Sequence, residues 1–350
     1  MRGGVVKGGM AMTARRLRAS LKGWGGVGAM ALALVVTAVF ALLLPLSSAR
    51  GDGSTGTGGQ GVGQAIQARA DTCTDPQNQS PSPSSDDSGK TITAIKQRGY
   101  LSVGVDQNSY RWGYRDPNNT AKSSDLEGFD IDLAHEIAGE ILGDPNAVRF
   151  HAIPTNQRIP AIKSGQVDMV VRTMTITCSR LKDVAFSAPY FLTGQQVLAP
   201  KTSDIKGYDK TLAGKRICSA AGSTAYDKLS ADKKAGALAS SADITTTVPN
   251  QLDCLVRLQL GQVDAVVTDG ALAASQAAQD PTVELKGKTF TEDYYGVAMK
   301  LGADDLVRRV NQVLVDYRKS GGWQASYTKW LSATLKADSP SATPPTAHYK

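Results

Sequence analysis

This 350-residue chain has only a few cysteines and histidines that could do redox chemistry or bind a transition metal. The cysteines and histidines are Cys73, Cys178, Cys218, Cys254, His135, His151 and His348. No two cysteines stand at C-x-x-C spacing, and none has histidines beside it at the spacing of metal ligands. An even number of cysteines favours disulfides if the chain is exported to an oxidising space, for which the N-terminus gives evidence below, so we predict disulfides, no metal site and no cofactor.

The first 49 residues have the composition of an export signal. They contain six basic residues and no acidic one, and residues 27–46 form an almost purely apolar run. Small residues at 47–49 suit signal-peptide cleavage. The run is also about long enough to cross a bilayer, so an uncleaved N-terminal membrane anchor is the alternative to a signal peptide. Both predict an extracytoplasmic protein, either secreted or attached to the outer face of the cytoplasmic membrane.

The charge distribution argues against nucleic acid as a partner. The chain carries a net charge of +7, but six of these charges lie in the first 49 residues and leave +1 for the rest. Nucleic-acid binding needs a clustered basic face, which a nearly neutral body does not supply.

Two segments have the composition of unfolded chain. Residues 50–90 are rich in Gly, Ser, Thr, Gln, Pro and Asp, and residues 336–350 are similar. Such segments bury too little apolar surface to offset their ordering entropy. We therefore predict a flexible linker at 50–90 and a disordered tail at 336–350.

The region between them, about 91–335, alternates short apolar runs with amphipathic stretches. Residues 101–105 (LSVGV) read as a first strand, and Asp130 as the N-cap of a helix with apolar residues on one face through residue 141. This alternation predicts βα units and a largely parallel sheet, and therefore an α/β fold.

A short internal repeat indicates two similar halves. Residues 156–171 and 250–267 each begin with Asn-Gln and a helical stretch, and they end in GQVDMVV and GQVDAVV. In such a unit Gly ends the helix and the apolar run enters a sheet that is buried on both faces. Coincidence between two common units is the alternative. Two similar lobes would offer strand ends to a shared crevice, where α/β sheets bind ligands.

Six motifs, in order, resemble the family 3 extracellular solute-binding proteins. They are residues 128–133 (GFDIDL), 165–168 (GQVD), 173–177 (TMTIT) with Arg180, 186–190 (FSAPY), 222–224 (GST) and 264–269 (DAVVTD). Members of this family are the polar amino-acid receptors of ABC importers. Within the family, the chain looks most similar to actinobacterial glutamate-binding proteins.

The resemblance implies a two-lobe fold of the periplasmic-binding-protein type II (Venus-flytrap) kind, with two crossings between the lobes. We place the crossings near residues 195–200 and 294–299. Lobe I then comprises residues 91–197 plus 296–335, and lobe II residues 198–295.

The resemblance also implies which residues bind the α-carboxylate of an amino acid. Arg180 stands at the position of the family's carboxylate-binding arginine, and its planar charged fork suits a carboxylate. Ser223 and Thr224 stand where a lobe II helix begins, and free backbone N–H groups there attract an anion. A simple N-cap is the other interpretation of this pair.

The resemblance also implies which residues bind the ammonium group of the amino acid. Thr173 and Thr175 match the positions that offer a carbonyl and a hydroxyl, and Asp269 matches the aspartate that pairs with the ammonium. Alternating Thr is also ordinary strand chemistry, and Asp at a strand end often caps the next helix.

Three residues bear on the ligand's side chain. Thr155 and Arg158 resemble positions that bind the distal carboxylate in glutamate and aspartate receptors, and Arg111 could add a second cation. The resemblance therefore favours glutamate or aspartate, with glutamine or asparagine next. Arg158 could instead be a solvated helix-start arginine, and the direction of Arg172 stays open.

The lobe assignment implies the disulfide pairs. Cys218 and Cys254 both fall in lobe II and are predicted to pair, and Cys73 then pairs with Cys178.

The resemblance implies a monomeric binding protein, not an enzyme, that delivers a free amino acid to an ABC transporter permease. One alternative is a sensor that docks on a membrane kinase or signalling protein. Another is a dehydratase-type enzyme on the same fold, although no His, Glu or Lys acid–base candidate stands in the six motifs.

Overall fold

The computed structural model describes residues 73–116, 126–335 and 339–350. The predicted signal peptide or anchor and the predicted linker up to residue 72 lie outside this range. Among the helices of the described residues, none combines the length and the apolar character needed to cross a bilayer.

The first of two main sheets has five strands in the order β4-β1-β5-β14-β6. These are β1 (Leu101–Val105), β4 (Val148–Ala152), β5 (Met169–Val170), β6 (Val184–Phe186) and β14 (Ala298–Lys300). β1 is parallel to β4 and β5, whereas β14 is antiparallel to β5 and β6. A short hairpin, β2 (Asn108–Ser109) and β3 (Gly113–Tyr114), follows β1.

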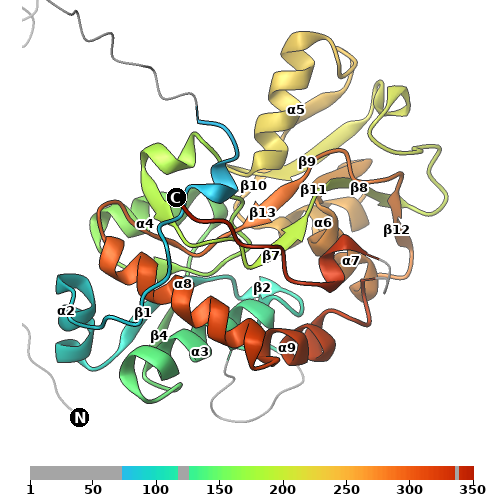
Figure 1. The fold of residues 1–350 in the computed structure, drawn as a ribbon. Helices are drawn as coiled ribbons and strands as arrows, with labels where there is room; N and C mark the ends of the chain where they lie inside the picture. Colours follow the sequence, from blue (N-terminus) through green and yellow to red (C-terminus); the bar gives the residue numbers. More distant parts are fainter. Residues whose placement is uncertain (1–72, 117–125, 336–338) are drawn as a thin grey trace, which may run out of the picture. The chain divides into compact units, whose positions relative to one another are not determined.

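Helices cover both faces of the first sheet because its strands are apolar on both sides. The helices are α2 (Lys90–Arg98), α3 (Phe129–Leu142), α4 (Arg158–Ser164), α8 (Asp304–Lys319) and α9 (Gly322–Trp330). Val103 and Met169 pack in one cluster with α3, α8 and α9, while Val170 packs with α4 on the other face. Figure 1 shows α8 and α9, from the C-terminal part of the chain, beside α3.

The second sheet also has five strands, in the order β10-β9-β11-β8-β12. These are β8 (Gln195–Pro200), β9 (Arg216–Ala220), β10 (Asp243–Val248), β11 (Ala265–Asp269) and β12 (Val283–Lys286). Its helices are α5 (Thr224–Ala235), α6 (Gln251–Gln259) and α7 (Gly270–Gln279). Along β11, Ala265 and Val267 face α5, and Val266 faces α6 and α7, as the period of a strand requires.

The two sheets have the same plan. In each, a central strand (β1 or β9) has a parallel neighbour on either side, and an antiparallel strand (β14 or β8) follows. The two copies of the internal repeat supply α4 with β5 and α6 with β11, which occupy equivalent places. Gly165 and Gly261 have φ of 74° and 64°, so both use the left-handed backbone that Gly adopts easily at the end of a helix.

A two-stranded ribbon joins the halves. β7 (Phe191–Thr193) pairs antiparallel with β13 (Asp293–Tyr295), and the chain passes from the first sheet to the second through one and back through the other. The structure therefore has the two crossings of the predicted fold. Residues 195–200, where the first crossing was predicted, form β8 of the second sheet, so the first crossing lies just before them.

Parts of the two segments that were predicted to be flexible or disordered are folded onto the body of the protein. Residues 73–89 of the predicted linker and residues 339–350 of the predicted tail lie against the body, and they include the short 3-10 helices η1 (Pro76–Asn78) and η5 (Pro340–Ala342). The buried Ser80 donates to the Phe186 carbonyl at 2.9 Å and accepts from the Lys350 N–H at 2.9 Å. These bonds, together with a disulfide at Cys73, offset an ordering entropy that composition alone sets against folding.

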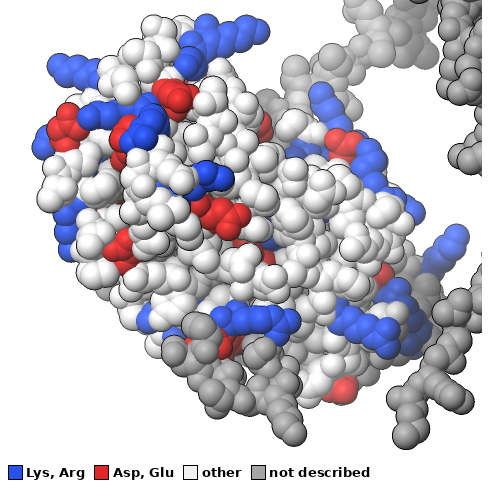
Figure 2. Space-filling view, turned by 180° about the vertical axis from the view of Figure 1, so that it is seen from behind, with Lys and Arg blue, Asp and Glu red and all other residues white. Residues whose placement is uncertain are grey.

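Further 3-10 turns lie between the main elements. They are η2 (Thr155–Gln157), η3 (Arg180–Lys182) and η4 (Lys210–Leu212). On the face shown in Figure 2, basic and acidic side chains are interspersed over a mostly uncharged surface.

Candidate functional site

A small cavity of about 10 Å³ lies where the carboxyl end of β11 and the start of α5 meet the loop that follows β5. Seven of the nine predicted ligand-binding residues line it: Arg158, Thr173, Thr175, Arg180, Ser223, Thr224 and Asp269. Ala225, Gln251 and Thr268 complete the lining. The structure thus brings together, from both halves, most of the residues that the family resemblance singled out.

Arg180 is almost fully buried at the start of η3. Its guanidinium donates to the Thr175 carbonyl at 2.7 Å and, across the halves, to the Gly222 carbonyl at 3.2 Å. Burial lowers its pKa, while the carboxylates of Asp227 and Asp269 act in the opposite direction. Arg180 therefore presents a fixed cation whose nearest bonds are to carbonyls.

Arg158, the first residue of α4, is a second buried cation at the cavity. It donates to the carbonyls of Thr155 at 2.9 Å, Arg172 at 3.1 Å and Thr173 at 3.4 Å. Among the described residues, no carboxylate forms an ion pair with it. Burial lowers its pKa well below the usual value, and the charges of Arg180 and Arg172 add to the effect.

Thr173 and Thr175 are held by the backbone around them. Thr173 has a φ of 39°, an unusual value for a residue with a side chain, and its N–H donates to Asp130 Oδ2 at 3.0 Å. The Thr175 hydroxyl lies 3.5 Å from that of Thr224 in the other half. The loop thus turns sharply at Thr173 and brings Thr175 to the opposite wall.

Asp130 has a different role from the predicted N-cap. Gly128 is the N-cap of α3, and Asp130 lies buried in the first turn, where it also accepts from Tyr190 Oη at 2.8 Å. Burial raises its pKa to about 7. Asp130 therefore supports the Thr173 turn from behind.

The wall from the second half is the start of α5. The Ser223 side chain accepts from the Tyr226 N–H at 3.2 Å, so Ser223 is the N-cap, and Thr224 is the first helical residue. Thr224 Oγ1 accepts from Gln195 Nε2 at 3.0 Å. The helix begins at the cavity, where unpaired backbone N–H groups favour an anion.

Asp269 ends β11 and is buried. Its carboxylate accepts from Gln195 Nε2 and from the Tyr295 hydroxyl. Burial raises its pKa to about 7, and the nearby Asp293 carboxylate adds to the shift. The positive charges of Arg158 and Arg180 oppose the shift without cancelling it.

Gln195, Asp293 and Tyr295 were not predicted from the sequence. Gln195 lies at the start of β8, and Asp293 and Tyr295 lie in β13 of the crossing ribbon, so all three resemble ordinary strand residues in the sequence. Gln251, also missed, is the first residue of α6, and its side chain accepts from Thr155 Oγ1 at 3.3 Å. The internal repeat marks Gln251, since it is the glutamine of the second Asn-Gln pair.

Two predicted residues do not line the cavity. Thr155 lies behind Arg158, and its N–H donates to the Pro249 carbonyl at 3.0 Å. Arg111 has a φ of 67° and donates to the Trp330 carbonyl at 3.1 Å, with its guanidinium over the Tyr110 ring. The turn directs Arg111 away from the cavity, so it does not supply the second cation there.

Arg172, whose direction the sequence left open, is fully buried behind the cavity. It forms an ion pair with Asp106 at 2.9 Å and donates to Thr155 Oγ1 and to Asn250 Oδ1, each at 3.0 Å. Asp106 balances its charge. Because Asn250 belongs to the second half, Arg172 also links the two halves.

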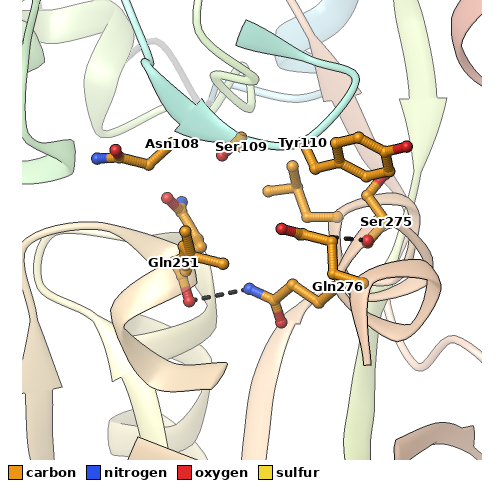
Figure 3. Close-up of a pocket in the computed structure, with 9 residues that line it drawn as sticks. Asn108, Ser109, Tyr110, Gln251, Ser275 and Gln276 are labelled. Atoms are coloured by element: carbon orange, nitrogen blue, oxygen red, sulfur yellow. Dashed lines mark hydrogen bonds between the residues drawn. The ribbon is translucent and has the colours of Figure 1, made fainter. Parts of the chain in front are cut away.

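A second cavity of about 10 Å³ lies between the β2 hairpin and helices α6 and α7. Figure 3 shows Asn108, Ser109 and Tyr110 facing Gln251 and Gln276 across it. Gln276 Nε2 donates to the Gln251 carbonyl at 2.9 Å. Gln251 thus contributes to the walls of both cavities.

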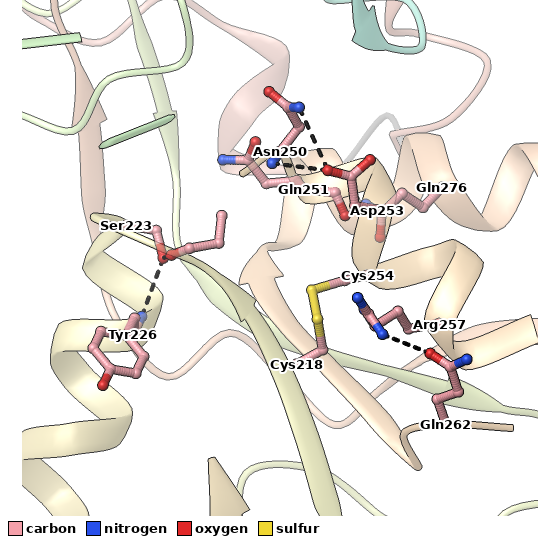
Figure 4. The surroundings of a disulfide bond; sticks show 11 residues. Cys218, Ser223, Tyr226, Asn250, Gln251, Asp253, Cys254, Arg257, Gln262 and Gln276 are labelled. Carbon is pink, nitrogen blue, oxygen red and sulfur yellow. Dashed lines mark hydrogen bonds between the residues drawn. A yellow bond between two sulfur atoms is a disulfide. The ribbon is translucent and has the colours of Figure 1, made fainter. Parts of the chain in front are cut away.

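Both predicted disulfides are present: Cys73–Cys178 and Cys218–Cys254. Figure 4 shows the second bond joining β9 to α6, near the Asn250–Asp253 capping box that starts the helix. This bond fixes α6, and with it Gln251, against the second sheet.

Comparisons with known proteins agree with this geometry. The model of the bacterial extracellular solute-binding proteins, family 3, matches residues 101–333. The ABC transporter glutamine-binding protein GlnH of Bacillus subtilis is 33% identical over 248 residues, 71% of this chain and 87% of that protein. The glutamate-binding protein GluB of Corynebacterium glutamicum is 27% identical over 254 residues, 69% of this chain and 82% of that protein.

A solved structure, an ancestral arginine-binding protein bound to glutamine, has 34% identity and a TM-score of 0.59. The match covers 67% of this chain and 98% of that one. These matched relatives are binding proteins rather than enzymes. The chain therefore belongs to the bacterial extracellular solute-binding proteins of family 3 and has their two-lobe α/β fold.

Proposed function

We propose that this protein is an extracytoplasmic receptor that closes on an acidic amino acid, glutamate or aspartate, and delivers it to an ABC importer. Glutamine and asparagine are the next candidates. The names of the relatives GlnH and GluB, which bind glutamine and glutamate, support an amino acid of this size. The observation that carries the acidic ligand is Arg158, a buried cation at the cavity without a carboxylate partner among the described residues.

The ligand's α-carboxylate binds between Arg180 and the start of α5. The arginine fork offers two parallel hydrogen bonds, and the N–H groups of the first turn of α5 add partial positive charge. Arg180 and Gly222 already meet across the halves at 3.2 Å, so one carboxylate can bridge the same two elements.

The ligand's ammonium binds at Asp269, assisted by the Thr173 carbonyl and the Thr175 hydroxyl. The Thr173 carbonyl accepts a single long bond from Arg158 at 3.4 Å and keeps a lone pair for the ligand. The Asp269 carboxylate accepts hydrogen bonds but forms no ion pair among the described residues, and because it is buried, a cationic partner lowers its free energy.

The side-chain carboxylate binds at Arg158. Three guanidinium groups lie close together here, but Arg172 is balanced by Asp106, and Arg180 is assigned to the α-carboxylate. Arg158 forms no ion pair with a carboxylate among the described residues, and only the attraction of the nearby Asp269 offsets its buried charge, so a second carboxylate of the ligand stabilises it. An amide side chain would satisfy its hydrogen bonds but not its charge.

Ligand access requires the lobes to separate. A cavity of about 10 Å³ holds about one water, so an amino acid fits only when the walls move apart. We assign the motion to two lobes, each built on one of the two main sheets, with β8 (Gln195–Pro200) in the second lobe and the β7–β13 ribbon as hinge. The closed form is what a membrane permease would recognise, and the N-terminal signal or anchor predicted from the sequence supports a receptor on the outer side of the cytoplasmic membrane.

Calorimetric titration of the protein with glutamate, aspartate, glutamine and arginine tests the proposal. We expect glutamate or aspartate to bind most tightly, because each has a second carboxylate for Arg158. Tightest binding of arginine would overturn the acidic-ligand assignment.

Affinity should fall on acidification. The pKa of Asp269 is raised to about 7, so its carboxyl takes up a proton as the pH falls below that value. Only the ionised form pairs with the ligand's ammonium, so affinity should drop by up to about tenfold per pH unit below pH 7. Titration at pH 6, 7 and 8 measures this slope. An Asp269→Asn variant should bind the ligand weakly, and its affinity should not depend on pH in this range. If the affinity of the variant still falls with the same slope, another group titrates, such as the adjacent Asp293.

A further inference from the structure

The Cys73–Cys178 disulfide lies next to the arginine of the cavity. Cys178 precedes Arg180 by two residues, and the Arg180 N–H donates to Thr177 Oγ1 at 3.2 Å. Thr177 Oγ1 also lies 3.0 Å from Ser179 Oγ. The disulfide is therefore attached within a tight turn, residues 177–180, that ends on Arg180.

The other end of the disulfide is fixed to the body of the first half. Seven residues after Cys73, the buried Ser80 donates to the Phe186 carbonyl at 2.9 Å and accepts from Asn311 Nδ2 at 2.7 Å. Phe186 belongs to β6 and Asn311 to α8. The covalent bond thus ties the turn to a segment that is anchored on a sheet and a helix.

Apart from the disulfide, the backbone of this turn is held by local bonds: the Leu181 N–H donates to the Thr177 carbonyl at 3.0 Å, and the Lys182 N–H donates to the Ser179 carbonyl at 3.3 Å. Ser179 is exposed, and Cys178 is only partly buried. The nearby Lys163–Asp183 ion pair has both side chains about half exposed, and such pairs contribute little. Without the disulfide, the backbone before Arg180 would gain conformational freedom that ligand binding would have to remove.

We propose that the Cys73–Cys178 disulfide is a positioning element for Arg180: it holds the 177–180 turn so that the guanidinium meets the ligand's α-carboxylate. This rests on the proposed function, in which Arg180 binds that carboxylate. Cys73 and Cys178 do not touch the ligand, and they act through Arg180.

The test is a Cys73→Ala/Cys178→Ala variant titrated with the amino acid that binds the unmodified protein most tightly and with the α-amide of that amino acid. If Arg180 is no longer held in position, its contact with the ligand's α-carboxylate weakens. The α-amide has no carboxylate at that place, so its affinity depends less on Arg180. We expect affinity for the amino acid to fall about tenfold and affinity for its α-amide about twofold or less. The discrimination between the two ligands therefore shrinks about fivefold.

The second disulfide supplies a matched control. A Cys218→Ala/Cys254→Ala variant also loses one covalent link, but in the half that does not carry Arg180. Because this bond fixes Gln251 and not the 177–180 turn, its loss should lower the melting temperature and change the affinity for both ligands by the same factor, so that the discrimination stays the same. The inference would be overturned if the Cys73/Cys178 variant lost the same factor of affinity for both ligands. It would also be overturned if the control variant lost as much discrimination as the Cys73/Cys178 variant.

The unmodified protein offers a second route if the variant does not fold. Cys73 is exposed, whereas Cys218 and Cys254 are fully buried, so mild dithiothreitol should open the first bond selectively. Dithiothreitol gives two electrons and two protons, yielding two protein thiols and its own cyclic disulfide, and thiol alkylation identifies the opened pair. Unchanged discrimination after selective opening would refute the positioning role. An unmodified protein that binds none of the four amino acids would refute the proposed function itself, and with it this inference.

Discussion

Replacing Arg180 with alanine is expected to abolish detectable amino-acid binding, with affinity lowered by about three orders of magnitude. The substitution leaves the ligand's α-carboxylate in a desolvated cleft without its cationic partner, and such truncations cost about 2–5 kcal/mol. Calorimetric titration with glutamate measures the loss. An Arg180→Lys variant should recover part of the affinity, because it keeps the charge but not the two-pronged geometry.

The fold of the Arg180→Ala variant must be checked separately, since the guanidinium also donates to the Thr175 and Gly222 carbonyls. Circular dichroism and the melting temperature provide that check. Arg257→Ala is a suitable control, because Arg257 is an exposed residue of α6 that contacts Gln262. Affinity that survives in Arg180→Ala would contradict the whole site assignment.

Replacing Arg158 with glutamine should change the ligand preference rather than abolish binding. Affinity for glutamate should fall about 100-fold, because the second carboxylate loses its compensating charge. Affinity for glutamine should change about threefold or less. Titration of the variant with both ligands measures the selectivity ratio directly.

Lys163→Gln is the matched control for this change. Lys163 lies on the same helix, α4, but is exposed and paired with Asp183, so its removal changes the net charge equally without touching the cavity. It should leave the ratio of glutamate to glutamine affinity unchanged. If Arg158→Gln weakens both ligands equally, then Arg158 holds the Thr155 and Thr173 carbonyls in place and does not select the ligand.

Much of the lining of the cavity could be predicted from the sequence because its residues lie in short local motifs. Thr173, Thr175 and Arg180 fall within one loop, and Asp269 ends the second apolar run of the internal repeat. The structure gathers them with Arg158, Ser223 and Thr224 around one cavity. Cysteine pairing followed from the assignment of the four residues to lobes, and both pairs are present.

The surroundings of Asp269 could not be predicted in the same way. Gln195 and Tyr295, which donate to its carboxylate, are 74 and 26 residues away in the sequence and come from strands β8 and β13. Nothing in their local pattern distinguishes them from other strand residues. Their position depends on the crossing ribbon, which forms only when distant segments pair.

The sequence by itself determined the alternation of strands and helices, the division into two similar sheets and the identity of the charged residues at the cavity. The tertiary structure decided where three arginines point: Arg111 toward Trp330, Arg172 toward Asp106, and Arg158 toward the cavity. It also decided that residues 73–89 and 339–350 pack on the body. The physical reason is that local periodicity specifies which face of an element is buried, whereas a long polar side chain takes its direction from partners that are distant in sequence.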